Sequence, residues 1–344
     1  MSEKTRYTIE SAAAVMEDLR NEIGRVFIGQ RFLVDHALIT LLAGGHLLVE
    51  GVPGLGKTLL VRAIARTIGG DSKRVQFTPD LMPSDITGSI MLDTVPAGTP
   101  GSAVYGGGRF ITKKGPVFTN LFIADEINRA PAKTQASLFE AMQELQVSLD
   151  GVGHPLPRPF MTLATQNPYE HEGTYPLPDA QKDRFLMKVL ADYPAEDEER
   201  LMVSQVLAGG TGAELSVDAV RAVLTPEDFT ALQDLASGIR VDDSVIDYAV
   251  RLVRSTRQLP SLQSGAGPRG SLALIRCARA RALLEGRPFV LPDDIKVLAA
   301  PALIHRLTLS AESELEGLNE GRIIESLLAR TEAPRGGGPE AADR

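Results

Sequence analysis

One eight-residue stretch constrains this chain more than any other. It reads GVPGLGKT, spans residues 51–58 and matches the pattern G-x-x-x-x-G-K-[ST]. The short apolar segment HLLVE precedes it, and LLVRAIARTI, which has helical periodicity, follows it. A strand, a glycine-rich loop and a helix in this order form a phosphate-binding unit of parallel α/β folds. The stretch therefore predicts both a fold class and a type of ligand.

The residue types of this loop suit a nucleotide and a magnesium ion. Glycines at 51, 54 and 56 let the backbone curl so that its N–H groups point at phosphate oxygens. Lys57 is placed to reach the β- and γ-phosphates, and the hydroxyl of Thr58 to bind Mg²⁺. An ordinary glycine-rich turn is the alternative. We expect ATP and Mg²⁺ as cofactors, with the nucleotide held by Gly51, Pro53, Gly54, Leu55, Gly56, Lys57, Thr58 and Leu59.

Polar residues also end two later apolar segments. LFIADE closes with Asp125 and Glu126, which we expect to hold Mg²⁺ through water and to act as the general base toward the attacking water. TLATQNP reaches Asn167, whose carboxamide can bond the γ-phosphate and that water, although Asn before Pro is also a common turn. Because the carboxyl ends of parallel strands converge on one crevice, we expect all three residues to face the loop.

Five short apolar segments, separated by stretches long enough for crossovers, predict a parallel sheet. They are residues 46–50, 74–78, 120–125, 160–165 and 185–190. After residue 193 this alternation stops and charged helical patterns follow. We predict an α/β P-loop ATPase core over residues 1–192 and an all-helical lid domain over 193–330. A disordered tail rich in Gly and Pro is expected over 331–344.

Composition excludes several other classes of protein. The formal net charge of −8 disfavours a protein that binds the nucleic-acid backbone. No apolar run approaches the roughly 20 residues that cross a bilayer, and the first residues carry no secretory signal, so we expect no membrane span and a cytoplasmic location. Cys277 is the only cysteine, which excludes a disulfide within the chain, and we expect it to be buried.

Several longer stretches resemble the MoxR family of AAA+ ATPases. Besides GVPGLGKT they are GPVFTNLFIADEINRAPAKTQASLFEAMQE, FMTLATQNP, YPLPDAQKDRF and GPRG, in the family's order. The resemblance implies a Walker A loop at 51–58, a Walker B pair at Asp125 and Glu126, sensor 1 at Asn167, the arginine finger at Arg184 and sensor 2 at Arg269. An arginine finger acts on the nucleotide of a neighbouring subunit. A homo-oligomeric ring is thus implied, with a hexamer as the expected size.

The resemblance also implies a role. Relatives use ATP hydrolysis for a chaperone-like remodelling, maturation or cofactor-insertion step on a client protein, together with a partner containing a von Willebrand factor A domain. Two inserted hairpins are expected, at residues 88–110 and 146–160, the second turning at Asp150-Gly151. The alternatives are the ATPase motor subunit of a metal chelatase, a nucleotide-dependent scaffold without turnover, and a nucleic-acid motor, which the acidic charge disfavours.

Overall fold

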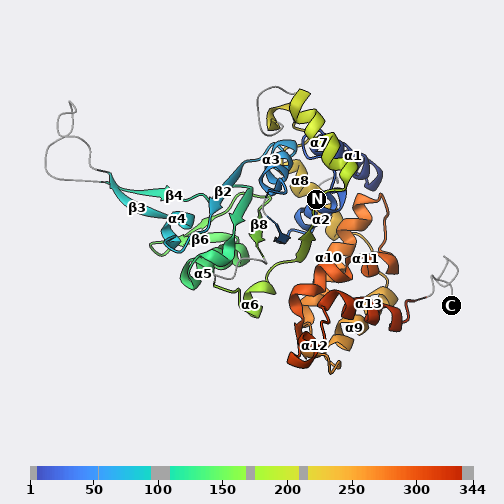
Figure 1. Cartoon of the computed structure of the whole chain (residues 1–344). Helices are drawn as coiled ribbons and strands as arrows, with labels where there is room; N and C mark the ends of the chain where they lie inside the picture. Colours follow the sequence, from blue (N-terminus) through green and yellow to red (C-terminus); the bar gives the residue numbers. More distant parts are fainter. Residues whose placement is uncertain (1–5, 53, 94–108, 168–174, 209–215, 335–344) are drawn as a thin grey trace, which may run out of the picture.

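The computed structural model describes residues 6–52, 54–93, 109–167, 175–208 and 216–334 of the 344-residue chain (Figure 1). Three sequence-based expectations fall partly outside these ranges. They concern Pro53 of the phosphate loop, the tip of the first hairpin at residues 94–108, and residues 335–344 of the tail.

A five-stranded sheet forms the centre of the molecule, in the order β2-β5-β8-β1-β9, and every neighbouring pair is parallel. This confirms the predicted sheet, with each predicted boundary shifted by two residues or fewer. The strands are β1 (Leu47–Gly51), β2 (Ser72–Gln76), β5 (Leu121–Asp125), β8 (Met161–Gln166) and β9 (Met187–Ala191).

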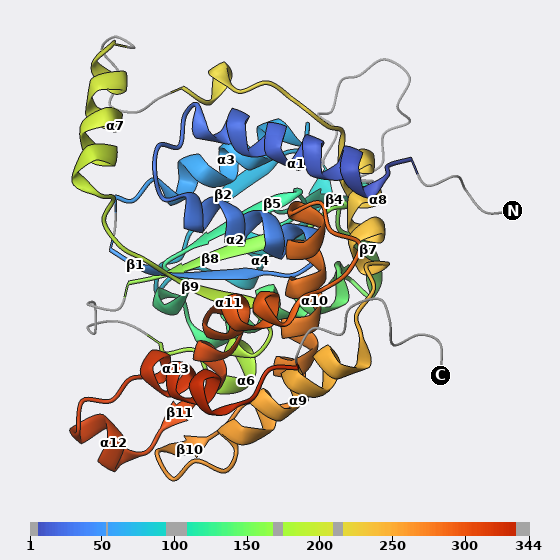
Figure 2. The ribbon, with the colours of Figure 1, turned by 90° about the vertical axis from the view of Figure 1, so that its right-hand side faces the viewer.

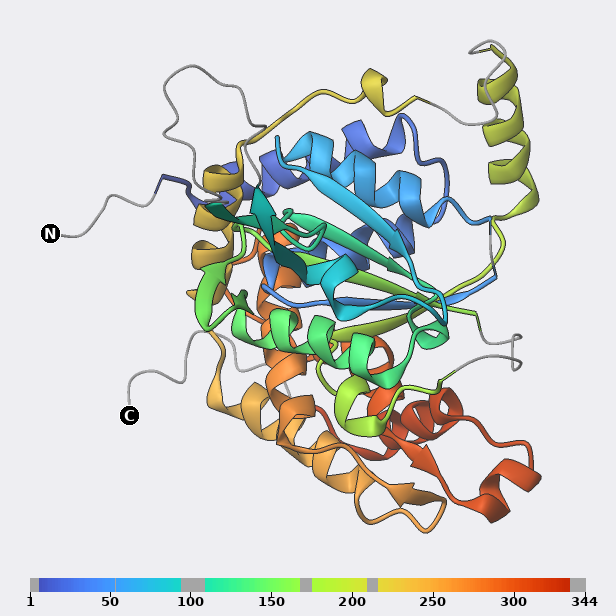
Figure 3. The same ribbon diagram turned by 90° about the vertical axis from the view of Figure 1, so that its left-hand side faces the viewer.

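Helices cover both faces of the sheet (Figures 2 and 3). In β1, Leu47 and Val49 belong to the buried cluster that includes one helical layer, and Leu48 belongs to the cluster on the other face. Burial on both faces explains why the central strands read as continuous apolar runs. The first layer contains α1 (Ile9–Gly24), α2 (Arg31–Leu42) and α3 (Lys57–Thr67), and the second contains α4 (Pro83–Thr87) and α5 (Ala132–Glu144).

The carboxyl-terminal part is helical, as predicted, apart from two very short paired strands. Its helices α8, α9, α10, α11 and α13 contribute to the same buried cluster as α1, α2 and α3, so one hydrophobic core runs from Ala12 to Leu327. The elements are α6 (Asp179–Lys182), α7 (Glu196–Ala208), α8 (Pro226–Ser237), α9 (Asp243–Thr256), β10 (Leu262–Ser264), α10 (Pro268–Leu284), α11 (Pro292–Leu303), β11 (Thr308–Leu309), α12 (Ala311–Leu315) and α13 (Glu320–Arg330).

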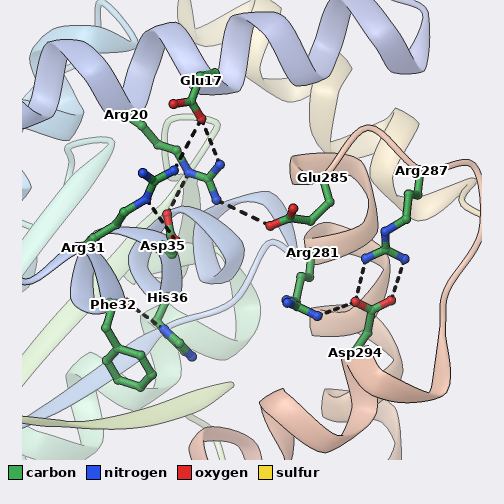
Figure 4. A network of polar contacts seen from close by, with 10 residues as sticks. All are labelled: Glu17, Arg20, Arg31, Phe32, Asp35, His36, Arg281, Glu285, Arg287 and Asp294. Atoms are coloured by element: carbon green, nitrogen blue, oxygen red, sulfur yellow. Dashed lines mark hydrogen bonds and ion pairs between the residues drawn. The ribbon is translucent and has the colours of Figure 1, made fainter.

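Charged side chains also connect α10 to the amino-terminal helices (Figure 4). Arg20 of α1 donates from Nε to Oδ1 of Asp35 in α2 at 2.7 Å, and its Nη2 lies 3.9 Å from Oε1 of Glu285, just after α10. Nearby, the fully buried carboxylate of Asp294 accepts hydrogen bonds of 2.6 Å from both Arg281 and Arg287. The carboxyl-terminal end of α10 is therefore held by charge as well as by packing.

Both expected hairpins form. The first pairs β3 (Gly88–Asp93) with β4 (Arg109–Lys114), and the second pairs β6 (Gln146–Leu149) with β7 (Val152–Pro155). Asp150 and Gly151 have φ values of 50° and 77°, as a tight two-residue turn requires. The first hairpin projects from the body on the side away from the lid helices (Figure 1). Within the described ranges, no helix is both long and apolar enough to cross a bilayer.

Two buried titratable side chains, those of Cys277 and His46, serve packing. Cys277 is fully buried, as predicted, and burial raises the pKa of its thiol to about 12. Burial lowers the pKa of His46 to about 4, so its ring is neutral near pH 7. Its Nδ1 accepts a hydrogen bond from the backbone of Thr162, and its Nε2 lies 3.0 Å from the carbonyl oxygen of Met142. His46 thereby connects β8 to α5.

Candidate active site

The predicted phosphate loop lies between β1, which ends at Gly51, and α3, which begins at Lys57. Gly54 and Gly56 have φ values of 83° and 71°, a left-handed conformation that favours glycine. A Cβ atom on Gly54 would meet nothing within 4 Å, whereas one on Gly56 would lie 3.3 Å from the ring of Phe27. The loop therefore has the backbone shape of an anion-binding site. Phe27, which precedes α2, lies against the last glycine of the loop.

Lys57 interacts both with the loop and, through its charge, with the acidic residues. Its Nζ donates a hydrogen bond of 2.9 Å to the carbonyl oxygen of Gly51. Burial lowers the pKa of this ammonium group, while the charges of Asp125, Glu126 and Glu50 act to raise it. The loop and the Walker B pair thus face each other across the site, as their sequence positions predict.

Asp125 ends β5 and is held from two sides. The hydroxyl of Thr165 on β8 donates to its Oδ1 at 2.5 Å, and Nε of Arg74 on β2 donates to its Oδ2 at 3.0 Å. Thr165 Oγ1 also accepts a bond of 2.9 Å from the backbone N–H of Glu126. One hydroxyl therefore fixes both acidic residues against the neighbouring strand.

Glu126 has a left-handed φ of 54°, which turns the chain sharply after β5. Its Oε2 accepts hydrogen bonds from Gln76 Nε2 at 2.8 Å and from Arg129 Nη1 at 2.9 Å. Arg129 therefore contacts Glu126 of its own chain. The Glu126 carboxylate is oriented by groups on both sides of it.

The sequence motifs leave out three residues that contact the acidic pair: Arg74, Gln76 and Thr165. A signal existed for the first two, because they alternate with period two along β2 and Gln76 pairs in register with Asp125. Polar residues two apart on a strand beside an acidic strand end point to the same edge of the sheet. For Thr165 the only signal is its place at the end of an apolar segment.

The oxygen donors at this edge fit a magnesium ion. A hydroxyl at Thr58 and a carboxylate at Asp125 are hard ligands of the kind Mg²⁺ prefers, together with phosphate oxygens and water. The described residues contain no group of three or more His, Cys, Asp or Glu side chains able to hold a metal alone. Arg74 shares Oδ2 of Asp125, so a cation and this guanidinium compete for one oxygen. Asn167 follows β8 directly and lies at the same edge.

Arg184 and Arg269 lie together, but not at this edge. Both line a cavity of about 390 Å³ whose other walls include residues 44–46, before β1, and residues 183–186, before β9. That cavity is therefore at the amino ends of the strands. The phosphate loop follows the carboxyl end of β1, and a five-residue strand spans roughly 16 Å. The structure brings the predicted sensor 2 and arginine finger together and separates both from the loop.

Around this cavity, arginines outnumber acids. Asp183 accepts a 2.8 Å hydrogen bond from Nε of Arg306 and lies 3.5 Å from Nη1 of Arg269. The guanidinium of Arg184 lies 5.8 Å from the ring centre of Phe139. Arg306 is only 4% exposed and also donates to the carbonyl oxygen of Phe185 at 2.7 Å. Arg306 therefore fixes the chain on both sides of Arg184. The sequence around Arg306 gives no indication of this role.

Comparison with known proteins agrees with this architecture. The model of the ATPase family associated with various cellular activities (AAA) matches residues 46–187, and that of the AAA lid domain matches residues 254–327. The uncharacterised protein YeaC of Bacillus subtilis is 44% identical over 91% of this chain and 92% of its own length. Chaperone MoxR1 of Mycobacterium tuberculosis is 41% identical over 91% of this chain and 81% of its own.

The chain belongs to the MoxR family of AAA+ ATPases. It hydrolyses ATP, with a parallel α/β core and a helical lid as the family's fold. The crystal structure of a candidate ATPase from Cytophaga hutchinsonii matches this MoxR-family ATPase with a TM-score of 0.84 and 37% identity. That match covers 94% of this chain and 96% of the other.

Proposed function

We propose that ATP and Mg²⁺ bind at the carboxyl edge of the sheet in one copy and that Arg184 and Arg269 of the next copy complete the site. The observation that carries this proposal is the separation of the two edges. Arginines at the amino ends of β1 and β9 cannot reach a phosphate held at the carboxyl end of β1 in the same chain. A head-to-tail contact between copies brings the two edges together.

Each residue then has a chemical task. Lys57 and the loop backbone neutralise phosphate charge, while Thr58 and Asp125 hold the cation that the phosphates share. Glu126 takes a proton from the attacking water, and Asn167 positions that water against the γ-phosphate. The planar guanidinium of Arg184 stabilises charge that develops on the transferred group, with Arg269 beside it. Leu55 of the loop and Leu59 of α3 complete the set of nucleotide contacts that we propose, together with Pro53 of the same sequence stretch.

The biological task we propose is chaperone-like remodelling, maturation or cofactor insertion on a client protein, carried out by a cytoplasmic ring that we take to be a hexamer. The name of the 41% identical relative, a chaperone, supports this task. The hairpin β3–β4, which projects away from the body, offers a surface that can contact a client (Figure 1). A partner with a von Willebrand factor A domain remains part of the proposal on the strength of the family resemblance.

Mixing two inactive variants tests the shared site. Lys57→Ala removes the charge that faces the phosphates but leaves Arg184 intact, and Arg184→Ala does the reverse. If the site is shared, each variant alone releases little phosphate and an equimolar mixture recovers a fraction of wild-type turnover. The specific activity of the wild type should also rise with protein concentration. A mixture as inactive as its components, or a specific activity independent of concentration, would overturn the proposal.

A further inference from the structure

Helix α7 stands apart from the body of the molecule. It follows β9 and occupies the periphery beside the carboxyl ends of the strands (Figures 2 and 3). Of its residues, Glu196–Ala208, all of which the structure describes, none is buried. A helix of 13 residues gains little stability alone in water, because most helical stability in proteins comes from packing. The part of the chain that the structure describes therefore leaves this helix uncovered, and its exposed side calls for a further packing partner.

One face of α7 is apolar. Met202 and Val203 precede Val206 and Leu207 by three to five residues, about one helical turn, which places all four on the same side of the helix. Met202, Val203 and Leu207 are 40%, 48% and 73% exposed. We call these four residues the α7 stripe. Leu201 is also exposed, at 49%, but lies on the opposite side of the helix. A continuous exposed stripe of this kind marks an interaction surface.

The first turn of α7 places the start of this helix beside the ATP site. Oε2 of Glu198 accepts a 3.5 Å hydrogen bond from the backbone N–H of Gln30. Gln30 lies just after the segment whose Phe27 ring packs against Gly56 of the phosphate loop. Ala191, at the end of β9, pairs with Gly51 at the start of that loop. The helix and the nucleotide site therefore belong to one edge of the molecule.

The amino edge has the complementary character. Four arginines, Arg184, Arg269, Arg276 and Arg306, line its cavity, together with Leu145 and Leu272, which are 39% and 64% exposed. On α7, the acidic residues Glu196 and Glu199 lie on the same side of the helix as the stripe, within the two turns before it, and Arg200 lies at the margin of that side. An acidic and apolar surface thus exists at one edge, and a basic and apolar surface at the other.

We propose that the α7 stripe docks on the amino edge of a second copy of this chain. The inference rests on the head-to-tail assembly proposed above, because any contact that brings Arg184 of one copy to the phosphate loop of the next also brings its amino edge to α7. Leu272 and Leu145 then cover the stripe, and Glu196 and Glu199 face the arginines. Helix α7 becomes the part of the interface that holds neighbouring copies together beside the shared site.

A charge placed on the stripe tests this docking. The double variant Val203→Arg and Leu207→Arg puts cations opposite the basic edge, and Leu201→Arg is the matched control on the other side of the helix. With Mg²⁺ and a non-hydrolysable ATP analogue, sedimentation velocity should show the double variant as monomer and the control assembled like the wild type. Concentration-dependent turnover should fall at least tenfold in the double variant only, with binding of a fluorescent ATP analogue retained. Normal assembly of the double variant, or equal loss in the control, would refute the docking.

A photo-crosslinking amino acid at position 207 identifies the surface that covers the stripe. In a mixture of ¹⁴N- and ¹⁵N-labelled copies, the cross-linked peptides between copies should come from the amino edge, at residues 142–145 or 269–276. Cross-links from α7 to α7 would mean a two-fold contact and would overturn the proposal. If the complementation of Lys57→Ala by Arg184→Ala succeeds while these tests fail, the shared site stands and only the role of α7 is lost.

Discussion

The two edges of the central sheet differ in charge and in the way they are built. At the carboxyl edge, Lys57 faces the carboxylates of Asp125 and Glu126, and hydrogen bonds from neighbouring strands hold each acid. At the amino edge, Arg184 and Arg269 surround an open cavity with Asp183 as the acidic residue among them. On the proposal made above, the first edge binds phosphate and activates water, and the second supplies positive charge to a phosphate held by a neighbouring copy. Each copy would then contribute one half to each of two shared sites.

Loss of the amino-edge charge should have the largest effect. Arg184→Ala should lower kcat for ATP hydrolysis by roughly 10³ to 10⁵-fold with little change in ATP affinity, because an arginine finger acts on the transition state. Steady-state phosphate release and calorimetric ATP titration measure the two quantities. Arg184→Lys is the control, since a point charge cannot reproduce the planar fork. A large loss of ATP affinity would instead place Arg184 among the groups that bind the ground state.

Loss of the proposed general base at the carboxyl edge should have the next largest effect on turnover. Glu126→Gln removes the general base and should slow hydrolysis by about 10² to 10⁴-fold while ATP still binds and copies still assemble. Single-turnover phosphate release measures the chemical step directly. Gln76→Ala, which removes one hydrogen bond to this carboxylate, should cost far less. Wild-type turnover in Glu126→Gln would show that another group activates the water.

We expect the stability of the amino edge to depend on the carboxylate of Asp183, which pairs with the buried Arg306. Asp183→Asn leaves the guanidinium of Arg306, 4% exposed, without its charged partner and should lower the free energy of unfolding by about 3 kcal/mol. Urea unfolding followed by circular dichroism measures the change. Asp179→Asn, in an exposed pair with Lys182, is the control and should change stability by less than about 1 kcal/mol. Equal effects of the two variants would mean that Arg306 is held by its carbonyl partners alone.

The segment between α7 and α8 gives the smallest effect, one that depends on pH. Its residues 216–225 run over α1 and α3 (Figure 2), and Arg221 among them donates to the carboxylate of Glu22 at 2.7 and 2.9 Å. These bonds lower the pKa of Glu22 from 4.5 to about 2. A lowered folded pKa adds stability above pH 4.5 that disappears as the pH falls toward 2.

Glu22→Gln should therefore be less stable than the wild type at pH 7, and the difference should shrink between pH 4.5 and pH 2. Urea unfolding at a series of pH values measures it. Glu17→Gln, on the same helix but more exposed, is the control. A stability difference that stays constant down to pH 2 would mean that the contact contributes by shape rather than by charge.

Local features of the sequence predicted the carboxyl edge well. The loop GVPGLGKT and the acids after LFIA each combine a strand end with a chemically specific residue, so the geometry follows once the sheet is parallel. The amino edge could not be predicted in the same way. That Arg269 meets Arg184 depends on how α10 packs against the core, and the part played by Arg306 depends on contacts more than a hundred residues away in the chain.

Helix α7 shows a further limit. Its segment, EDEERLMVSQVL, predicts a helix correctly, but the apolar spacing that normally indicates a face buried in the same chain here marks a face left exposed. Periodicity indicates which side of a helix is buried by packing. It does not indicate whether the same chain or another molecule packs against that side. The three central strands β5, β8 and β1 carry no such ambiguity, because an apolar strand between two others must be covered by its own helices.

The continuous hydrophobic core that joins α1 and α2 to α10 and α11 has a mechanical consequence. A lid that swung on its own would have to break close packing along α10 and part Arg20 from Glu285. These contacts oppose a movement of the lid relative to the sheet within one chain. In the ring proposed above, we therefore expect hydrolysis to tilt whole subunits against their neighbours, so that force on a client would come from the displacement of entire chains.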